Sequence, residues 1–217
     1  MYFGFDTETS GLDPRDGAQI LSLAYILLTD DLHEVARKQY FVMPDENAVL
    51  SPQALAINGY TPELWKSRNA IEQDELFERL RADWKYYELF GAWPLGQNVG
   101  FDLDFLKEGG RSRPSFAAAQ KRALSYHKVD TISLAVPLDA AFGIRGEKYG
   151  LIPLCERWGV PLTNAHDSMA DIEATVNLYR ALVGVLRTAT PPERPAAPVS
   201  PAAAAVMVRR CRTSSVV

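Results

Sequence analysis

The chain has 217 residues but only two cysteines and three histidines. Cys155 and Cys211 cannot supply a disulfide framework or a cysteine-rich zinc site, so a reducing, cytoplasmic compartment is expected. No run of about 18 apolar residues occurs, and we predict no membrane span. The N-terminal segment MYFGFDTETS has no basic region followed by a long apolar one, so no signal peptide is predicted.

An excess of basic residues is also missing, because the formal net charge is −4. Any contact with nucleic acid must therefore come from local patches, or from cations that offset clustered carboxylates. The last thirty positions, 188–217, carry four Arg and one Glu. They contribute +3, so residues 1–187 carry −7 and are more acidic than the whole chain.

Composition divides the chain into two parts near Thr188. Residues 189–205 contain five Pro and seven Ala, and such a segment cannot bury a core. We predict one domain over residues 1–187, followed by a Pro/Ala-rich linker and a short basic tail over 188–217, both disordered.

Strand patterns and helix patterns alternate along residues 1–187, and this order predicts an α/β fold. Three early strands are expected to form an antiparallel meander, and the later strands to complete a mixed sheet with helices on its faces. The expected strands are Tyr2–Asp6, Gln19–Leu28, Glu34–Met43, Trp93–Leu95 and one ending at Lys128–Asp130. The expected helices are Ile71–Phe90, Asn98–Lys107, one starting at Thr131–Val136, Gly150–Trp158 and Ser168–Leu186.

Two acidic residues lie where the first strand pattern ends. Asp6 and Glu8 are two residues apart, so their side chains share one face of a strand. Adjacent carboxylates repel each other unless a cation lies between them. The alternative is a solvated strand end that runs into a turn at Ser10–Pro14.

A third acid lies in the segment NVGFDLDFL. Asn98 and Asp102 are four residues apart and share a helix face, with Phe101 and Phe105 beside them. A simpler interpretation makes Asn98 a helix cap and leaves Asp102 without a function. Asp104 is expected to be solvated.

The segment AHDSMAD supplies the last acid and a histidine. Ser168 and Asp171 have the spacing of a capping box, which gives Asp171 a purely structural alternative. His166 can converge with Asp171 only if it lies in the loop before the helix, with Asp167 or Ser168 as the cap. His33 is interpreted as surface and His127 as structural.

Together these residues suit the hydrolysis of a phosphodiester. Hard oxygen ligands favour Mg²⁺ or Mn²⁺ over zinc. Two such ions, roughly 3.5–4 Å apart, can stabilise the attacking and leaving oxygens. A histidine beside them can take a proton from the attacking water.

The motifs DTETSGL, NVGFD and HDSMAD, in this order, resemble those of the DEDDh (DnaQ-like) 3′→5′ exonuclease family, which includes the proofreading epsilon subunit of bacterial DNA polymerase III. The segments ALAINGYTPEL, VDTISLA and GLIPLCERWGV are similar as well. The resemblance implies a ribonuclease H-like fold. It also implies that Asp6, Glu8 and Asp171 bind one metal ion, that Asp6 bridges to a second, that Asp102 acts through metal-bound water, and that His166 is the general base.

The resemblance extends to the substrate. It implies that backbone groups near Thr9–Leu12, which include Gly11, contact the 3′ nucleotide and that the Leu12 side chain wedges against the terminal base. Family members that proofread commonly carry an acid and a histidine where this chain has Gln53 and Asn58. Asn58 can still bind a sugar or phosphate, but the preferred sugar is left open.

We therefore expect a DNA 3′→5′ exonuclease that releases nucleoside 5′-monophosphates in proofreading or repair. One alternative is an exoribonuclease that acts on oligoribonucleotides or RNA 3′ ends, and a second is a non-catalytic nucleic-acid-binding or scaffold protein. The expected partner is a single-stranded 3′ end. The C-terminal tail suggests a DNA polymerase as a further partner, and the alternative is a tail without one.

Overall fold

The computed structural model describes residues 1–144 and 148–188. Met1–Leu186 form one compact unit. Almost all of the predicted linker and tail, 188–217, lies outside the described residues, so that prediction stays open. No helix in the described parts of the chain is both long enough and apolar enough to cross a membrane.

The fold is built on a five-stranded mixed sheet in the order β3-β2-β1-β4-β5. The strands β1 (Tyr2–Thr9), β2 (Ile20–Leu28) and β3 (Glu34–Phe41) form the expected antiparallel meander. The strands β4 (Trp93–Gly96) and β5 (Val129–Asp130) continue the sheet in parallel from β1. The α/β fold class is confirmed, and β1 is its central strand.

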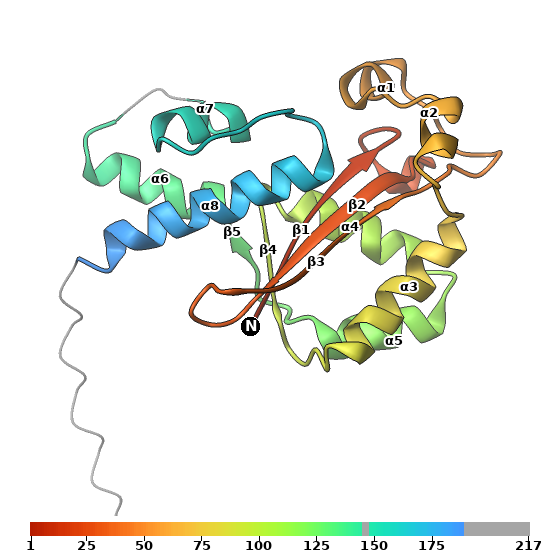
Figure 1. The fold of residues 1–217 in the computed structure, drawn as a ribbon, viewed down its shortest axis with the longest axis horizontal. Helices are drawn as coiled ribbons and strands as arrows, with labels where there is room; N and C mark the ends of the chain where they lie inside the picture. The colour runs from red at the N-terminus through yellow and green to blue at the C-terminus, as the bar shows by residue number, and fades with distance from the viewer. Residues whose placement is uncertain (145–147, 189–217) are drawn as a thin grey trace, which may run out of the picture. The chain divides into compact units, whose positions relative to one another are not determined.

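Helices cover both faces of this sheet (Figure 1). On one face, Phe3 and Phe5 of β1 join the core formed with α3 (Gln73–Tyr86), α4 (Gly100–Gly109) and α5 (Pro114–Ala123). On the other face, α8 (Ser168–Leu186) packs on β1, β2 and β4. The helices α6 (Thr131–Ala141) and α7 (Leu151–Arg157) pack outside α8. The side chains of β1 therefore contribute alternately to two separate helix layers.

Three helices are absent from the sequence-based expectation. They are α1 (Pro52–Asn58), α2 (Pro62–Ser67) and α5. The first two are too short to show an apolar period, although Ser51 and Thr61 cap them and a proline follows each cap. The alanine-rich α5 also starts at a proline. In the sequence, a capping residue followed by a proline marks the start of α1 and of α2, whereas only a proline marks the start of α5.

The start of α4 corrects the expected helix Asn98–Lys107, because α4 begins at Gly100 and Asn98 therefore shares no helix face with Asp102. The alternative interpretation of Asn98 fails as well. Asn98 does not cap the helix, because it lies before the cap position with a φ of 55°. Val99 occupies the cap, and its backbone N–H donates to Asp130 Oδ2 at 3.0 Å. A carboxylate from the end of β5 thus replaces the local asparagine, and long-range packing sets where α4 begins. Asp104 is exposed, as expected.

Candidate active site

The central strand β1 carries the first two acids. It extends to Thr9, so both Asp6 and Glu8 lie inside the strand and not at its end. They share a face with Gly4, where an added Cβ would lie 3.3 Å from Ile26 O and 3.4 Å from Val176 Cγ2. The missing side chain lets α8 approach β1 closely. The strand bulges between Glu8 and Thr9, which ends regular pairing beside the acids.

The N-terminus of α8 brings the histidine motif to this strand. Asp167 Oδ1 accepts the backbone N–H groups of Met169 and Ala170 at 3.1 and 3.2 Å, so Asp167 is the helix cap. His166 lies in the preceding loop with a φ of 70°, and its backbone N–H donates to Asp171 Oδ2 at 3.1 Å. The loop geometry expected for His166 is therefore present.

Asp102 reaches the site from the other helix layer. Its Oδ1 accepts the backbone N–H of Thr7 at 2.9 Å and the Thr7 hydroxyl at 2.6 Å. Parallel pairing of β1 with β4 stops at Gly4, so the Asp102 carboxylate takes over a strand N–H that β4 no longer reaches. This contact fixes Asp102 against the central strand, at 3% exposure.

Three of the side chains lie close enough to share one cation. Ligand atoms of Glu8, His166 and Asp171 all lie within 4.8 Å of one another. Asp6 and Asp102 fall outside this tight group but interact with it electrostatically, because, in addition to burial, Glu8 and Asp171 raise the pKa of Asp6 and Asp102 raises that of Glu8. Asp171 Oδ1 is buried and has no hydrogen-bond partner among residues 1–144 and 148–188. A buried orphan carboxylate oxygen beside other acids fits a divalent cation.

The electrostatics of the site agree with that fit. Burial and the neighbouring carboxylates raise the pKa of Glu8 to about 8. Burial raises the pKa of Asp102 to about 7 in spite of the hydrogen bonds from Thr7. The pKa of Asp6 is raised well above its usual range by burial, then by Asp102 and Glu8, and burial also raises that of Asp171. Such carboxylates ionise fully only when a cation compensates them.

The residues expected to meet the substrate surround the end of β1. Leu12 is 85% exposed, whereas Gly11 is buried and Thr9 donates its hydroxyl to Gly11 O at 2.7 Å. Asn58 Nδ2 donates to Thr9 O at 3.0 Å, and Asn58 Oδ1 accepts the backbone N–H of Tyr60. Asn58 therefore ties α1 to β1. Gln53 is exposed in the first turn of α1, where its side chain accepts from Ser51.

Sequence reasoning missed three residues that hold the site together. Thr7 and Asp130 brace the segment that carries Asp102. Arg68, at the end of α2, lies over the rings of Phe41 and Trp65 and 4.0 Å from Asp167. Thr7 lies within the DTETSGL motif, and its place between Asp6 and Glu8 is a signal by which the sequence could have identified it. The contact of Arg68 depends on folding and leaves no local pattern.

A mixed sheet whose central strand presents paired acids to a helix start is the arrangement of ribonuclease H-like nucleases. Residues 3–179 match the family model described as an exonuclease of the RNase T group. The chain therefore belongs to this exonuclease family, of the DEDDh type, as its motifs predicted.

Individual relatives agree with this assignment. Ribonuclease T of Photobacterium profundum is 26% identical over 82% of this chain and 79% of the relative. DNA polymerase III subunit epsilon of Rickettsia conorii is 24% identical over 82% of this chain and 72% of the relative. The structure of E. coli exonuclease I with a dT13 oligonucleotide superposes with a TM-score of 0.71, at 21% identity, over 86% of this chain. This chain spans 41% of exonuclease I, and that likeness shows the ribonuclease H-like fold.

Proposed function

We propose that the chain is a metal-dependent 3′→5′ exonuclease that removes nucleoside 5′-monophosphates from the 3′ end of DNA. The observation that carries the proposal is the convergence of Glu8, His166 and Asp171 on one point, with Asp6 and Asp102 beside them. Each acid taken alone has a structural explanation, but three separate elements would not bury acids together for stability.

Mg²⁺ or Mn²⁺ fits this donor set, because four carboxylates supply the hard oxygen ligands that these ions prefer. Asp6, Glu8 and Asp171 would hold one ion, Asp6 would also face a second, and Asp102 would act through water. When bound, two ions would stabilise the charge that develops on the phosphate oxygens. The buried, unpartnered Asp171 Oδ1 supports this assignment.

His166 is the proposed general base. Its backbone N–H is fixed by Asp171, while its side chain is exposed beside the acids. The imidazole would take a proton from the attacking water as the P–O bond to the leaving 3′ oxygen breaks.

The 3′ end of the nucleic-acid strand would be recognised around residues 9–12. Leu12 is a large apolar side chain left 85% exposed next to the acids, where it would wedge against the terminal base. The backbone of Thr9–Leu12 would contact the 3′ nucleotide. Asn58 already binds two backbone groups, so only its remaining donor and lone pair are free for a sugar or phosphate.

The same chemistry supports a second candidate, a 3′→5′ exoribonuclease. Relatives named ribonuclease T favour it, since one of them aligns with 82% of this chain. The decisive experiment uses two 5′-labelled strands of one sequence, one DNA and one RNA, incubated with the protein and Mg²⁺. Faster shortening of DNA supports the leading proposal, and much faster shortening of RNA contradicts it.

A polymerase partner through residues 188–217 also remains a proposal. One relative is a DNA polymerase III subunit, and the tail has the charge and composition of a tether. Removal of residues 189–217 should leave hydrolysis of a free single strand unchanged, because every proposed site residue precedes them. A loss of that activity would place the domain boundary elsewhere.

A further inference from the structure

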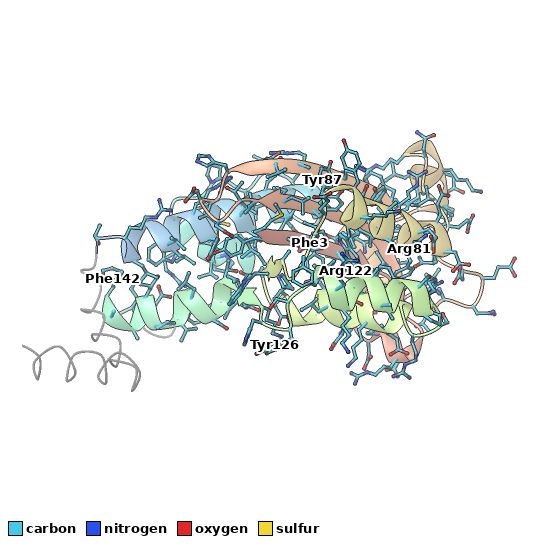
Figure 2. All side chains as sticks on the ribbon, turned by 90° about the horizontal axis from the view of Figure 1, so that it is seen from below. Phe3, Arg81, Tyr87, Arg122, Tyr126 and Phe142 are labelled. Carbon is cyan, nitrogen blue, oxygen red and sulfur yellow. The ribbon has the colours of Figure 1, made fainter. Side chains whose placement is uncertain are left out.

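A second concave site lies between the helices α3 and α5. It has a volume of about 670 Å³, within the range of about 300–1,000 Å³ that is typical of ligand pockets. Its buried base includes Trp84 and Leu89, which are 3% and 5% exposed. Its exposed rim carries Arg81 and Lys85 from α3 and Arg122 from α5. Figure 2 shows Arg81 and Arg122 on these two adjacent helices. We refer to this site as the α3–α5 groove.

The groove is separate from the candidate active site. Leu89 is followed by Ala92, which bridges to Leu124 after α5, and by Trp93, which pairs with Tyr2 at the start of β1. Glu8 lies six residues further along β1, a distance of roughly 20 Å along a strand. The groove thus opens beside the beginning of the central strand, and the acids gather at its other end.

The charge of the groove opposes that of the chain. Three cations and one acid, Glu88, line it, whereas the chain has a net charge of −4. Among the described residues, Lys85 and Arg122 form no ion pair. Arg81 pairs only with Glu78 of its own helix, and both are exposed. An exposed pair of this kind exchanges partners at little cost. The groove therefore favours an acidic occupant and disfavours the basic C-terminal tail.

The apolar base indicates what else the occupant carries. Trp84 packs against Phe3 and Phe116 and is nearly fully covered, so it offers no open ring face on which a nucleic-acid base could stack. Small residues line the α5 wall, among them Ala118 and Ala119. They allow another backbone to approach closely. An aliphatic side chain can fill the space above Leu89 while carboxylates meet the rim.

We propose that the α3–α5 groove docks an acidic amphipathic helix of a partner protein. Arg81 and Lys85 are four residues apart, so they form a cationic row one turn long on one face of α3. A helix laid along that row would present acids one turn apart to it and its apolar side chains to the space above Leu89. Docking there leaves the candidate active site free.

The proposal can be tested with the full-length chain and a fluorescein-labelled peptide of about 16 residues, made of Ala, Leu and Glu with one leucine face. We expect saturable binding by fluorescence anisotropy and no binding of a matched peptide with Lys in place of Glu. The double variant Lys85→Glu/Arg122→Glu should weaken binding at least tenfold. Ala118→Trp, at an exposed position, should weaken it similarly by filling the groove.

Lys121→Glu provides the matched control, because Lys121 is exposed on α5 but does not line the groove. It should bind the acidic peptide like the wild type. Thermal melts will identify any variant that fails to fold. Equal binding by the wild type and the double variant, or no saturable binding at all, would overturn the proposal. A single-stranded oligonucleotide is tested in the same way in chelator. If the double variant binds the oligonucleotide more weakly than the wild type does but binds the peptide equally well, the proposal is also overturned.

All groove variants should hydrolyse a short labelled single strand at the wild-type rate. This readout separates the groove from the proposed nuclease function, since either can fail while the other holds.

Discussion

The acids at the end of β1 should destabilise the metal-free protein as pH rises, and Glu8→Gln tests this. The folded protein holds the Glu8 proton up to a pKa of about 8, compared with 4.5 for an ordinary glutamate. Between these values the folded state binds more protons than the unfolded state, so the free energy of unfolding falls with increasing pH. The contribution is fully present below about pH 4.5 and lost above about pH 8.

The size of the effect follows from the difference of about 3.5 pKa units between those two values. At 1.36 kcal/mol per unit the upper bound is about 5 kcal/mol, and screening by water at this partly exposed side chain reduces it to about 2–4 kcal/mol. For a chain of this size, that range corresponds to a difference in Tm of about 5–15 °C at pH 8.5. Glu8→Gln should therefore melt higher than the wild type at pH 8.5 and at the same temperature near pH 4.5.

The assay is thermal unfolding in chelator at a series of pH values, with Glu46→Gln, at an exposed loop position, as the matched control. Some pH dependence should remain in Glu8→Gln, because Asp102 has a pKa of about 7. Excess Mn²⁺ should raise the melting temperature of the wild type at pH 8.5. It should raise that of Glu8→Gln much less, because the ion stabilises the folded state only by binding to it and the variant lacks one proposed ligand. Parallel melting curves for wild type and Glu8→Gln would refute this account of the site.

Substitutions at three further positions test how the site is held. Gly4→Val should cost about 1–3 kcal/mol and lower the hydrolysis rate at least tenfold, because the added methyl groups push α8 and Asp171 away from β1. Melting and rate are both measured, and an unchanged rate would show that the close approach is unimportant. Thr7→Val removes the hydroxyl that donates to Asp102, so unfolding should cost about 1–2 kcal/mol less. Thr7→Ser should retain most of that stability. Arg68→Ala should raise KM for a single strand several-fold with little change in kcat, because the stacked guanidinium is a fixed cation beside Asp167. A fall in kcat alone would show that it acts through Asp167.

The sequence predicted those parts of the site that depend on local spacing. The alternation of Asp6 and Glu8 placed both on one strand face, and the capping pattern around Asp167 placed His166 in a loop. These inferences need only the repeat of a strand and the ends of a helix.

The remaining features depend on contacts between distant segments. Thr7 and Asp102 are 95 residues apart, and no periodicity connects them. The helix was expected to begin at Asn98, but α4 begins at Gly100, Asp130 from β5 binds the N–H of the cap residue Val99, and Asn98 adopts a left-handed conformation. The α3–α5 groove likewise exists only once the two helices pack. Local pattern therefore identified the motifs, and tertiary packing decided how they are braced.

The central claim is that the acids of β1, α4 and α8 form one hydrolytic site. Its most direct test is the rate of mononucleotide release from a 5′-labelled single strand in Mg²⁺, measured for the wild type, Asp6→Asn and Asp104→Asn. Asp104 is exposed on α4, close to Asp102 in sequence, and provides the control. We predict that Asp6→Asn lowers the rate by a factor of about 10³ or more, since it removes a ligand from the proposed metal site, while Asp104→Asn leaves it unchanged. Wild-type release by Asp6→Asn would contradict the account.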